Sequence, residues 1–247
     1  EGIIEGTPVY RARLELGRKL ANVVKEKILR NEIEVDLVAP VPDTSRTAAT
    51  ALAESLGLPY REVLIKNRYI KRTFILESEE KRKSAVDLKL NPVVSEIRGK
   101  NILLVDDSIV RGTTSRKIID LVRRAGAKKI YFVSTCPPIR YPCYYGIDFP
   151  SSTELIAGEH TELEIADILG ADGVIYQDQT GLVQALQDAK LGSKANYDNP
   201  CMACINGKYP TDVSLASMLA NLREKQRANQ RENNQNGVVL RSGELQK

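Results

Sequence analysis

Hydrophobic positions along the chain follow two patterns, a helical period and short unbroken runs. From Val9 to Leu29 apolar residues recur at helical spacing, which predicts an amphipathic helix beginning after Pro8. Short apolar runs are typical of strands buried on both faces of a parallel sheet. Such runs are found at residues 35–41, 60–65, 102–105, 129–134 and 173–177. The order of these segments predicts an α/β fold with a mainly parallel five-stranded sheet flanked by helices.

Further helices are predicted between and after these strands. The best defined follows Ser45 and runs to about Leu56, because Gly57 and Pro59 close it. The stretch 140–159 has neither pattern and is expected to form an irregular hood. Other helices are expected at residues 162–169, at 182–191 and beyond 214.

One stretch joins a strand, an acidic pair, a loop of small residues and a helix. The run 102–105 is followed at once by Asp106 and Asp107, and the turn ends at Gly112. Backbone N–H groups of such a loop and of a helix start make an anion site at the carboxyl end of a strand. Paired acids suit sugar hydroxyls or Mg²⁺, so a phosphorylated ribose with a bound metal would satisfy the whole stretch. The hydroxyls available to phosphate oxygens are those of Thr113, Thr114 and Ser115.

Spacing alone leaves an alternative for this stretch, namely an ordinary strand–helix unit with a capping turn and two surface acids. The loop has neither the GxxxxGK[ST] pattern nor the GxGxxG fingerprint. Neither of those phosphate-binding motifs therefore explains it.

A second candidate region is polar, basic and weakly periodic, and it runs from Lys66 to Lys89. A long loop in a compact domain is usually functional or disordered. Lys66, Arg68 and Arg72 are candidates to neutralise a diphosphate, the arginines by bidentate contacts. The alternative is a solvated run of charges.

Composition excludes several classes of partner. The 247 residues are 42% hydrophobic, enough for one large core, and the net charge is only +4. Aromatic residues make up 5% and do not interleave with basic ones, so a nucleic-acid stacking surface is not expected. No apolar run approaches the length of a membrane span and no signal peptide is recognised. We therefore expect no nucleic-acid or membrane partner and a cytoplasmic location.

Five motifs follow one another along the chain: PDTS at 42–45, IKNRYIKRTFI at 65–75, VDDSIVRGTTS at 105–115, PPIRYPCYYGID at 137–148 and STELIA at 152–157. In this order they resemble motifs of type I phosphoribosyltransferases, in particular of the members that carry an amino-terminal glutaminase domain. The resemblance covers nearly the whole chain and implies the type I fold with a flexible loop, a hood and a helical carboxyl-terminal extension. It implies that ammonia displaces diphosphate from phosphoribosyl diphosphate (PRPP), giving phosphoribosylamine for purine synthesis.

The resemblance also implies roles for individual residues. Lys66 and Arg72 would help the leaving group depart, and the loop that holds them would close over PRPP. Lys71 stands where many members have glycine. Mg²⁺ would lie beside Ser45, Asp106 and Asp107. The expected PRPP-binding residues are Asp43, Thr44, Ser45, Asp106, Asp107, Ser108, Arg111, Gly112, Thr113, Thr114 and Ser115.

Three of the four cysteines suggest a cluster. Cys143, Cys201 and Cys204 match ligands of a [4Fe–4S] centre in family members that have one, and the fourth ligand would precede residue 1. Such a cluster would be structural. The alternative is three unligated thiols, with Cys136 as ordinary core.

The resemblance finally implies an organisation. We expect a phosphoribosyltransferase domain at 1–190, a cysteine-containing extension at 191–228 and a disordered tail at 229–247. A glutaminase domain would lie outside this chain, which begins at Glu1. The intact protein is expected to be a homotetramer inhibited by purine nucleotides. Two alternatives remain: a phosphoribosyltransferase that takes a nucleobase, and a PRPP-binding regulator that has lost catalysis.

Overall fold

The computed structural model describes residues 2–67, 90–147, 152–190, 197, 199–219 and 222. Its central sheet has four parallel strands in the order β3-β6-β7-β8. Their bounds are β3 (Leu37–Pro40), β6 (Asn101–Asp106), β7 (Lys129–Ser134) and β8 (Gly173–Tyr176).

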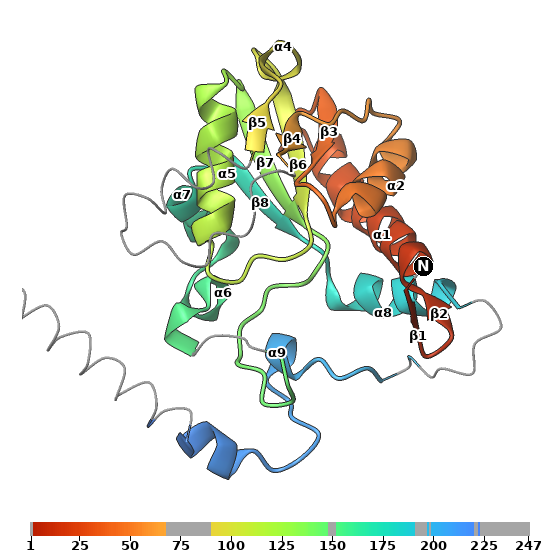
Figure 1. The fold of residues 1–247 in the computed structure, drawn as a ribbon, viewed down its shortest axis with the longest axis vertical. Helices are drawn as coiled ribbons and strands as arrows, with labels where there is room; N and C mark the ends of the chain where they lie inside the picture. The colour runs from red at the N-terminus through yellow and green to blue at the C-terminus, as the bar shows by residue number, and fades with distance from the viewer. Residues whose placement is uncertain are drawn as a thin grey trace, which may run out of the picture.

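Helices cover both faces of this sheet (Figure 1). One face packs against α1 (Val9–Leu29) and α2 (Arg46–Leu56), and the other against α5 (Thr113–Arg124) and α7 (Glu162–Leu169). Successive strand residues point to opposite faces, so Leu103 faces the first pair of helices and Leu104 the second. The interior residues of β6, Ile102 to Val105, are therefore all apolar, which explains the unbroken run there.

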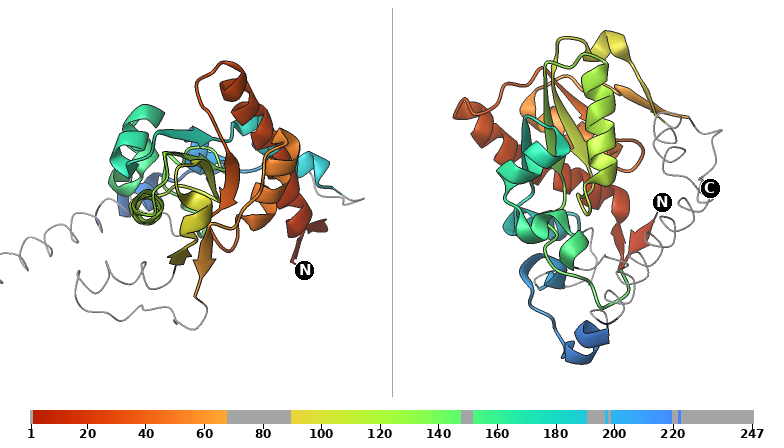
Figure 2. Two further views of the ribbon diagram at one scale, coloured as in Figure 1. Left: turned by 90° about the horizontal axis from the view of Figure 1, so that it is seen from above. Right: turned by 90° about the vertical axis from the view of Figure 1, so that its left-hand side faces the viewer.

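Smaller elements surround the three layers (Figures 1 and 2). β1 (Ile3–Ile4) and β2 (Thr7–Pro8) form a hairpin before α1, and β4 (Leu64–Lys66) pairs antiparallel with β5 (Leu90–Pro92). A further helical stretch covers residues 214–219. The remaining short elements are α4 (Val94–Ile97), η1 (Ser152–Glu154), α6 (Ile156–Glu159), α8 (Gln179–Asp188) and α9 (Ala203–Asn206).

The structure confirms the α/β class, the parallel sheet and the flanking helices, but the sheet has four strands, because the strand expected at 60–65 joins it by a single bridge only. Tyr60 makes a single parallel bridge to Val38, and the chain then leaves the sheet. Val63 N–H donates to the carbonyl of Arg61, while the Val63 carbonyl accepts from Val93 N–H. This local turn directs the chain into the β4–β5 pair, so residues 61–65 cannot extend the parallel ladder.

The helix expected at 182–191 begins and ends three residues earlier, as α8 (Gln179–Asp188). Asp178 caps it, because its carboxylate accepts a hydrogen bond of 2.6 Å from Gly181 N–H. The prediction began at the first apolar residue and overlooked this cap.

Close packing of α1 on α2 holds the first turn of α2 in place. A Cβ on Gly17 would lie 2.2 Å from the carbonyl oxygen of Ala48, in the first turn of α2. Only glycine lets the two backbones approach this closely. The start of α2, which follows the PDTS motif, is therefore held against α1.

Several sequence predictions fall outside the described residues, namely those for Arg68, Lys71, Arg72 and the tail at 229–247. The domain boundaries stay predictions. In the described part of the chain, no helix combines the length and apolar character that crossing a membrane requires.

Candidate active site at the ends of two strands

The site lies where two neighbouring strands send the chain to opposite faces of the sheet. β3 is followed by α2 on one face and β6 by α5 on the other. Val41 N–H donates to the carbonyl of Val105 over 2.8 Å, so the two strand ends lie side by side. In open α/β sheets, ligands bind outside the carboxyl ends of strands at such a switch point.

The acidic pair lies at the end of β6. Asp107 N–H donates to Asp106 Oδ1 over 2.9 Å, and Thr135 N–H donates to the Asp106 carbonyl over 3.0 Å. Burial raises the pKa of Asp106 from 3.8 to about 6; the neighbouring Asp107 adds to the rise, and the backbone hydrogen bond opposes it. The Asp106 carboxyl is thus a half-buried group whose charge would gain from a cation or a hydroxyl donor.

Residues 107–115, called here the phosphate loop, run from the end of β6 into the first turn of α5. Gly112 has a φ of +73°, and a Cβ there would lie 2.7 Å from Ile156 Cδ1 and 2.9 Å from Leu169 Cδ2. No side chain of the described residues caps the start of α5. The helix dipole and the first backbone N–H groups are therefore available to an anion.

Side chains of the phosphate loop differ in their exposure. Thr113 and Thr114 are exposed, Ser108 is half-buried and Ser115 is buried. Arg111, expected to bind PRPP, pairs instead with Glu154 through Nε and Nη2, each 3.0 Å from Oε2. This pair joins the loop to η1 in the hood.

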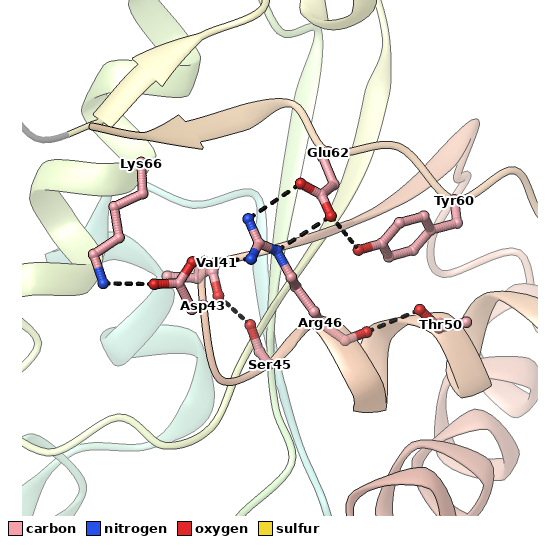
Figure 3. Close-up of polar contacts among 8 residues, drawn as sticks. All are labelled: Val41, Asp43, Ser45, Arg46, Thr50, Tyr60, Glu62 and Lys66. Carbon is pink, nitrogen blue, oxygen red and sulfur yellow. Dashed lines mark hydrogen bonds and ion pairs between the residues drawn. The ribbon is translucent and has the colours of Figure 1, made fainter. Parts of the chain in front are cut away.

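The second part of the site is the turn from Pro42 to Ser45, called here the diphosphate turn (Figure 3). The peptide between Pro42 and Asp43 is cis. Ser45 is fully buried and its hydroxyl donates to the carbonyl of Val41, whereas Thr44 is exposed. The Ser45 oxygen keeps lone pairs for a metal or a donor, while its proton is already used.

Ion pairs surround the diphosphate turn. Lys66 Nζ lies 2.7 Å from Asp43 Oδ2, and Arg46 Nη1 lies 3.0 Å from Asp43 Oδ1. Arg46 continues to Glu62, with Nε 3.1 Å from Oε1 and Nη2 donating to Oε2 over 3.2 Å. Sequence reasoning found Asp43 and Lys66 but missed Arg46 and Glu62. Arg46 follows the PDTS motif directly, whereas Glu62 is brought near only by tertiary structure.

The cysteines lie near one another but form no metal site in the described part of the chain. Burial raises the pKa of Cys204, and the nearby Cys143 and Cys201 raise it further. The Cys204 carbonyl accepts from the N–H groups of Arg140 and Tyr141, both over 2.9 Å, which ties α9 to the hood. Among the described residues, no three His, Cys, Asp or Glu side chains could hold a metal ion. Burial raises the pKa of Cys136 to about 12, as suits a core thiol.

Comparison with known proteins decides the family. The model of the phosphoribosyl transferase domain matches residues 12–146, which include both the diphosphate turn and the phosphate loop. The chain belongs to the phosphoribosyl transferase domain family. The match ends within the hood, at residue 146, so the extension with Cys201 and Cys204 lies beyond it.

Individual phosphoribosyltransferases are similar over most of the chain. The amidophosphoribosyltransferase of Pseudomonas aeruginosa is 48% identical over 219 residues, which are 87% of this chain and 42% of that protein. That of Methanocaldococcus jannaschii is 45% identical over 89% of this chain and 43% of its own length. The solved glutamine PRPP amidotransferase from B. subtilis is 41% identical, with a TM-score of 0.70 over 84% of this chain and 44% of that one. The chain thus spans under half the length of these relatives.

Proposed function

We propose that this chain is the phosphoribosyltransferase part of an amidophosphoribosyltransferase. It would convert PRPP and ammonia to 5-phosphoribosylamine and diphosphate, the first committed step of purine synthesis. The observation that carries the proposal is the meeting of two different anion-binding segments, residues 42–45 and 106–115, at the ends of adjacent strands. PRPP has a phosphate at one end of its ribose and a diphosphate at the other. The similarity to amidophosphoribosyltransferases supports ammonia as the acceptor.

Different residues would bind different parts of PRPP. Gly112, Thr113 and Thr114 would hold the 5′-phosphate, with Ser108, Arg111 and Ser115 beside them. Asp106 and Asp107 would accept from the 2′- and 3′-hydroxyls. Positive charge develops on the ribosyl carbon as diphosphate leaves, so the nearby carboxylates stabilise it. The diphosphate turn with Thr44 and Ser45 would hold the leaving group, and Lys66 and Arg72 would neutralise it. No protein nucleophile is needed, because positioning and electrostatics suffice.

Mg²⁺ fits the donor set at the strand ends. In proteins it binds through one or two carboxylates together with substrate phosphates, and it does not need a dedicated protein cage. Among the described residues, no cation pairs with the half-buried carboxylate of Asp106. Asp107 and the Ser45 oxygen lie at the ends of the same two strands. When bound, Mg²⁺ would neutralise diphosphate and make it a better leaving group.

A [4Fe–4S] cluster is proposed only for the intact protein. Three thiolates are too few for the usual four-cysteine ligand set, and the described cysteines do not make a metal-holding group by themselves. A fourth ligand from outside this chain would be required. Iron content and visible absorbance of the intact protein test this directly, and iron-free protein of full activity would contradict it.

Partners and regulation follow from the same relatives. The B. subtilis enzyme was solved with ADP and GMP, which supports purine nucleotides as feedback inhibitors of this protein too. We further propose that the intact protein is a cytoplasmic homotetramer, in which a glutaminase domain supplies the ammonia.

The proposal is tested by incubating the chain with PRPP and Mg²⁺, given either an ammonium salt at alkaline pH or glutamine at neutral pH. We expect phosphoribosylamine and diphosphate to form with ammonia and not with glutamine, because free amine is the nucleophile. Raising the pH should increase the rate for the same reason. Product formation from glutamine would refute the proposed division of labour, and no product from either source would refute the activity.

A further inference from the structure

The ion pairs around Asp43 link two segments that are separate in sequence. Arg46 belongs to the first turn of α2, whereas Glu62 and Lys66 belong to the segment that runs from the Tyr60 bridge into β4. Figure 3 shows the side chains converging on the diphosphate turn from these two sides.

Asp43 is the centre of this arrangement. Its two carboxylate oxygens lie near different cations, Oδ2 at 2.7 Å from Lys66 Nζ and Oδ1 at 3.0 Å from Arg46 Nη1. A carboxylate held in this way would repel a diphosphate placed directly against it. The chemistry therefore favours Asp43 as the group that orients the cations, with the cations meeting the anion.

Arg46 is held in turn from its other side. Its guanidinium contacts Glu62 at two points: Nη2 donates to Oε2 over 3.2 Å, and Nε lies 3.1 Å from Oε1 as an ion-pair contact outside hydrogen-bond geometry. This two-point contact holds the guanidinium beside Glu62. The Tyr60 hydroxyl donates to Glu62 Oε1 over 3.3 Å, which places Glu62 next to the point where its segment meets the sheet. The distance between the start of α2 and the base of β4 is thus set by the Arg46–Glu62 pair.

We propose that Arg46 and Glu62 are positioning residues for the diphosphate-binding side of the site. They hold Asp43 and Lys66 so that the Lys66 ammonium points at the diphosphate turn before ligand arrives. When diphosphate binds, Lys66 exchanges Asp43 for a diphosphate oxygen, and Arg46 keeps Asp43 neutralised. This inference rests on the proposed function for the identity of the anion.

A neighbouring ion pair, Arg61–Glu96, provides a control for the Arg46–Glu62 pair. Arg61 Nε lies 3.4 Å from Glu96 Oε2, and the side chains of Glu96 and Glu62 are 45% and 43% exposed. Glu96 is thus matched to Glu62 in charge, exposure and location, but it pairs with Arg61 and not with Arg46. Each pair by itself adds little to the stability of the fold, because both are partly exposed to solvent.

The experiment is calorimetric titration with inorganic diphosphate and Mg²⁺ of the whole chain and of its Glu62→Gln, Glu96→Gln, Lys66→Met and Glu62→Gln/Lys66→Met variants. We expect Glu62→Gln to weaken diphosphate binding about fivefold, and Glu96→Gln to leave it unchanged. In the Lys66→Met background, Glu62→Gln should have little further effect, because its action passes through Lys66. Melting temperatures should be equal for the two glutamine variants.

Wild-type affinity in Glu62→Gln, or an effect as large in Glu96→Gln, would overturn the inference. So would a fivefold loss that persists in the Lys66→Met background. Arg46→Lys gives a second check, because it keeps the charge but loses the two-point contact, and it should weaken binding as Glu62→Gln does. A chain that binds diphosphate with this pattern yet makes no phosphoribosylamine would refute the proposed function and leave the inference standing.

Discussion

The two halves of the candidate site are held in place by different forces. Apolar packing fixes the phosphate loop: Gly112 sits against the side chains of Ile156 and Leu169, and Ile109 is 1% exposed. Partly exposed ion pairs surround the diphosphate turn, where the Asp43 and Lys66 side chains are 37% and 44% exposed.

The difference fits what each half would have to do. A 5′-phosphate keeps its bonds throughout the reaction, so a rigid cradle suits it. The diphosphate leaves, so groups that can exchange one partner for another suit that end. Ion pairs near water exchange easily and are weakened by salt, whereas close-packed side chains are not. Substitutions in the two halves should therefore differ in the size and in the kind of their effects.

The largest effect is expected where the two halves meet, at the acidic pair. Replacing Asp106 and Asp107 together by asparagine should lower PRPP turnover by at least about a thousandfold, because two carboxylates facing the ribose are lost. Circular dichroism should match that of the wild type, since the substitutions keep size and hydrogen-bonding capacity. Near-normal kinetics in the double variant would show that the site is wrongly assigned.

Packing of the phosphate loop is tested by Gly112→Ala, with Gly57→Ala as a matched control. Both glycines have positive φ, +73° and +65°, but a Cβ on Gly57 has nothing within 4 Å. The control should lose about 1 kcal/mol from backbone strain alone. Gly112→Ala should lose roughly 2–4 kcal/mol, because overpacking against Ile156 and Leu169 is added. Equal losses in denaturant titrations of the two variants would argue against the apolar cradle.

Burial of the Asp106 carboxyl lowers the free energy of unfolding by an amount that depends on pH. Its pKa is raised from 3.8 to about 6, so the folded state binds the proton more tightly than the unfolded state. Ionisation of Asp106 therefore destabilises the fold above about pH 6, and this cost disappears below about pH 4. Asp106→Asn should raise the free energy of unfolding at pH 8 by roughly 2 kcal/mol, with the gain shrinking as the pH falls through 6.

Urea titrations of wild type and Asp106→Asn at pH 8 and at pH 4.5 measure this gain. An equal gain at both pH values would mean that ionisation of Asp106 is not its cause. Together with the loss of turnover, a more stable but inactive variant would mark Asp106 as a residue placed for function at the expense of stability.

The smallest effect is expected at the exposed ion pair between Arg111 of the phosphate loop and Glu154 of the hood. Glu154→Gln should change the free energy of unfolding by less than about 1 kcal/mol, because the Arg111–Glu154 pair is largely solvated. Released from Glu154, Arg111 would be available to a phosphate, so ribose 5-phosphate should bind about twofold more tightly. Weaker binding in this variant would instead mean that Glu154 positions Arg111 for the ligand.

Sequence patterns predicted the parts of the fold that depend on local period. The helices at Val9–Leu29 and Glu162–Leu169 and the strand at Lys129–Ser134 have the predicted bounds, because apolar positions and caps are encoded in adjacent residues. The run at 60–65 looks like a strand by the same criterion. Its partner is β5, which lies beyond the long stretch 68–89, and no local pattern reveals that pairing.

The candidate site was predictable to a similar degree. Asp106, Gly112 and Asp43 lie in contiguous motifs whose chemistry is visible in the sequence. Glu62 and Glu154 are ordinary acids in sequence, and they matter because the fold brings them to Arg46 and Arg111. Sequence therefore finds groups that would touch the ligand more readily than groups that position them.

The most direct test of the two-part site is calorimetric titration of the chain with ribose 5-phosphate, with Mg²⁺ diphosphate, and with each in the presence of saturating amounts of the other. The two-part site predicts that both ligands bind together, one per chain each, and that ribose 5-phosphate binding is lost in the Asp106/Asp107 double asparagine variant. Competition between ribose 5-phosphate and diphosphate for a single site would contradict it.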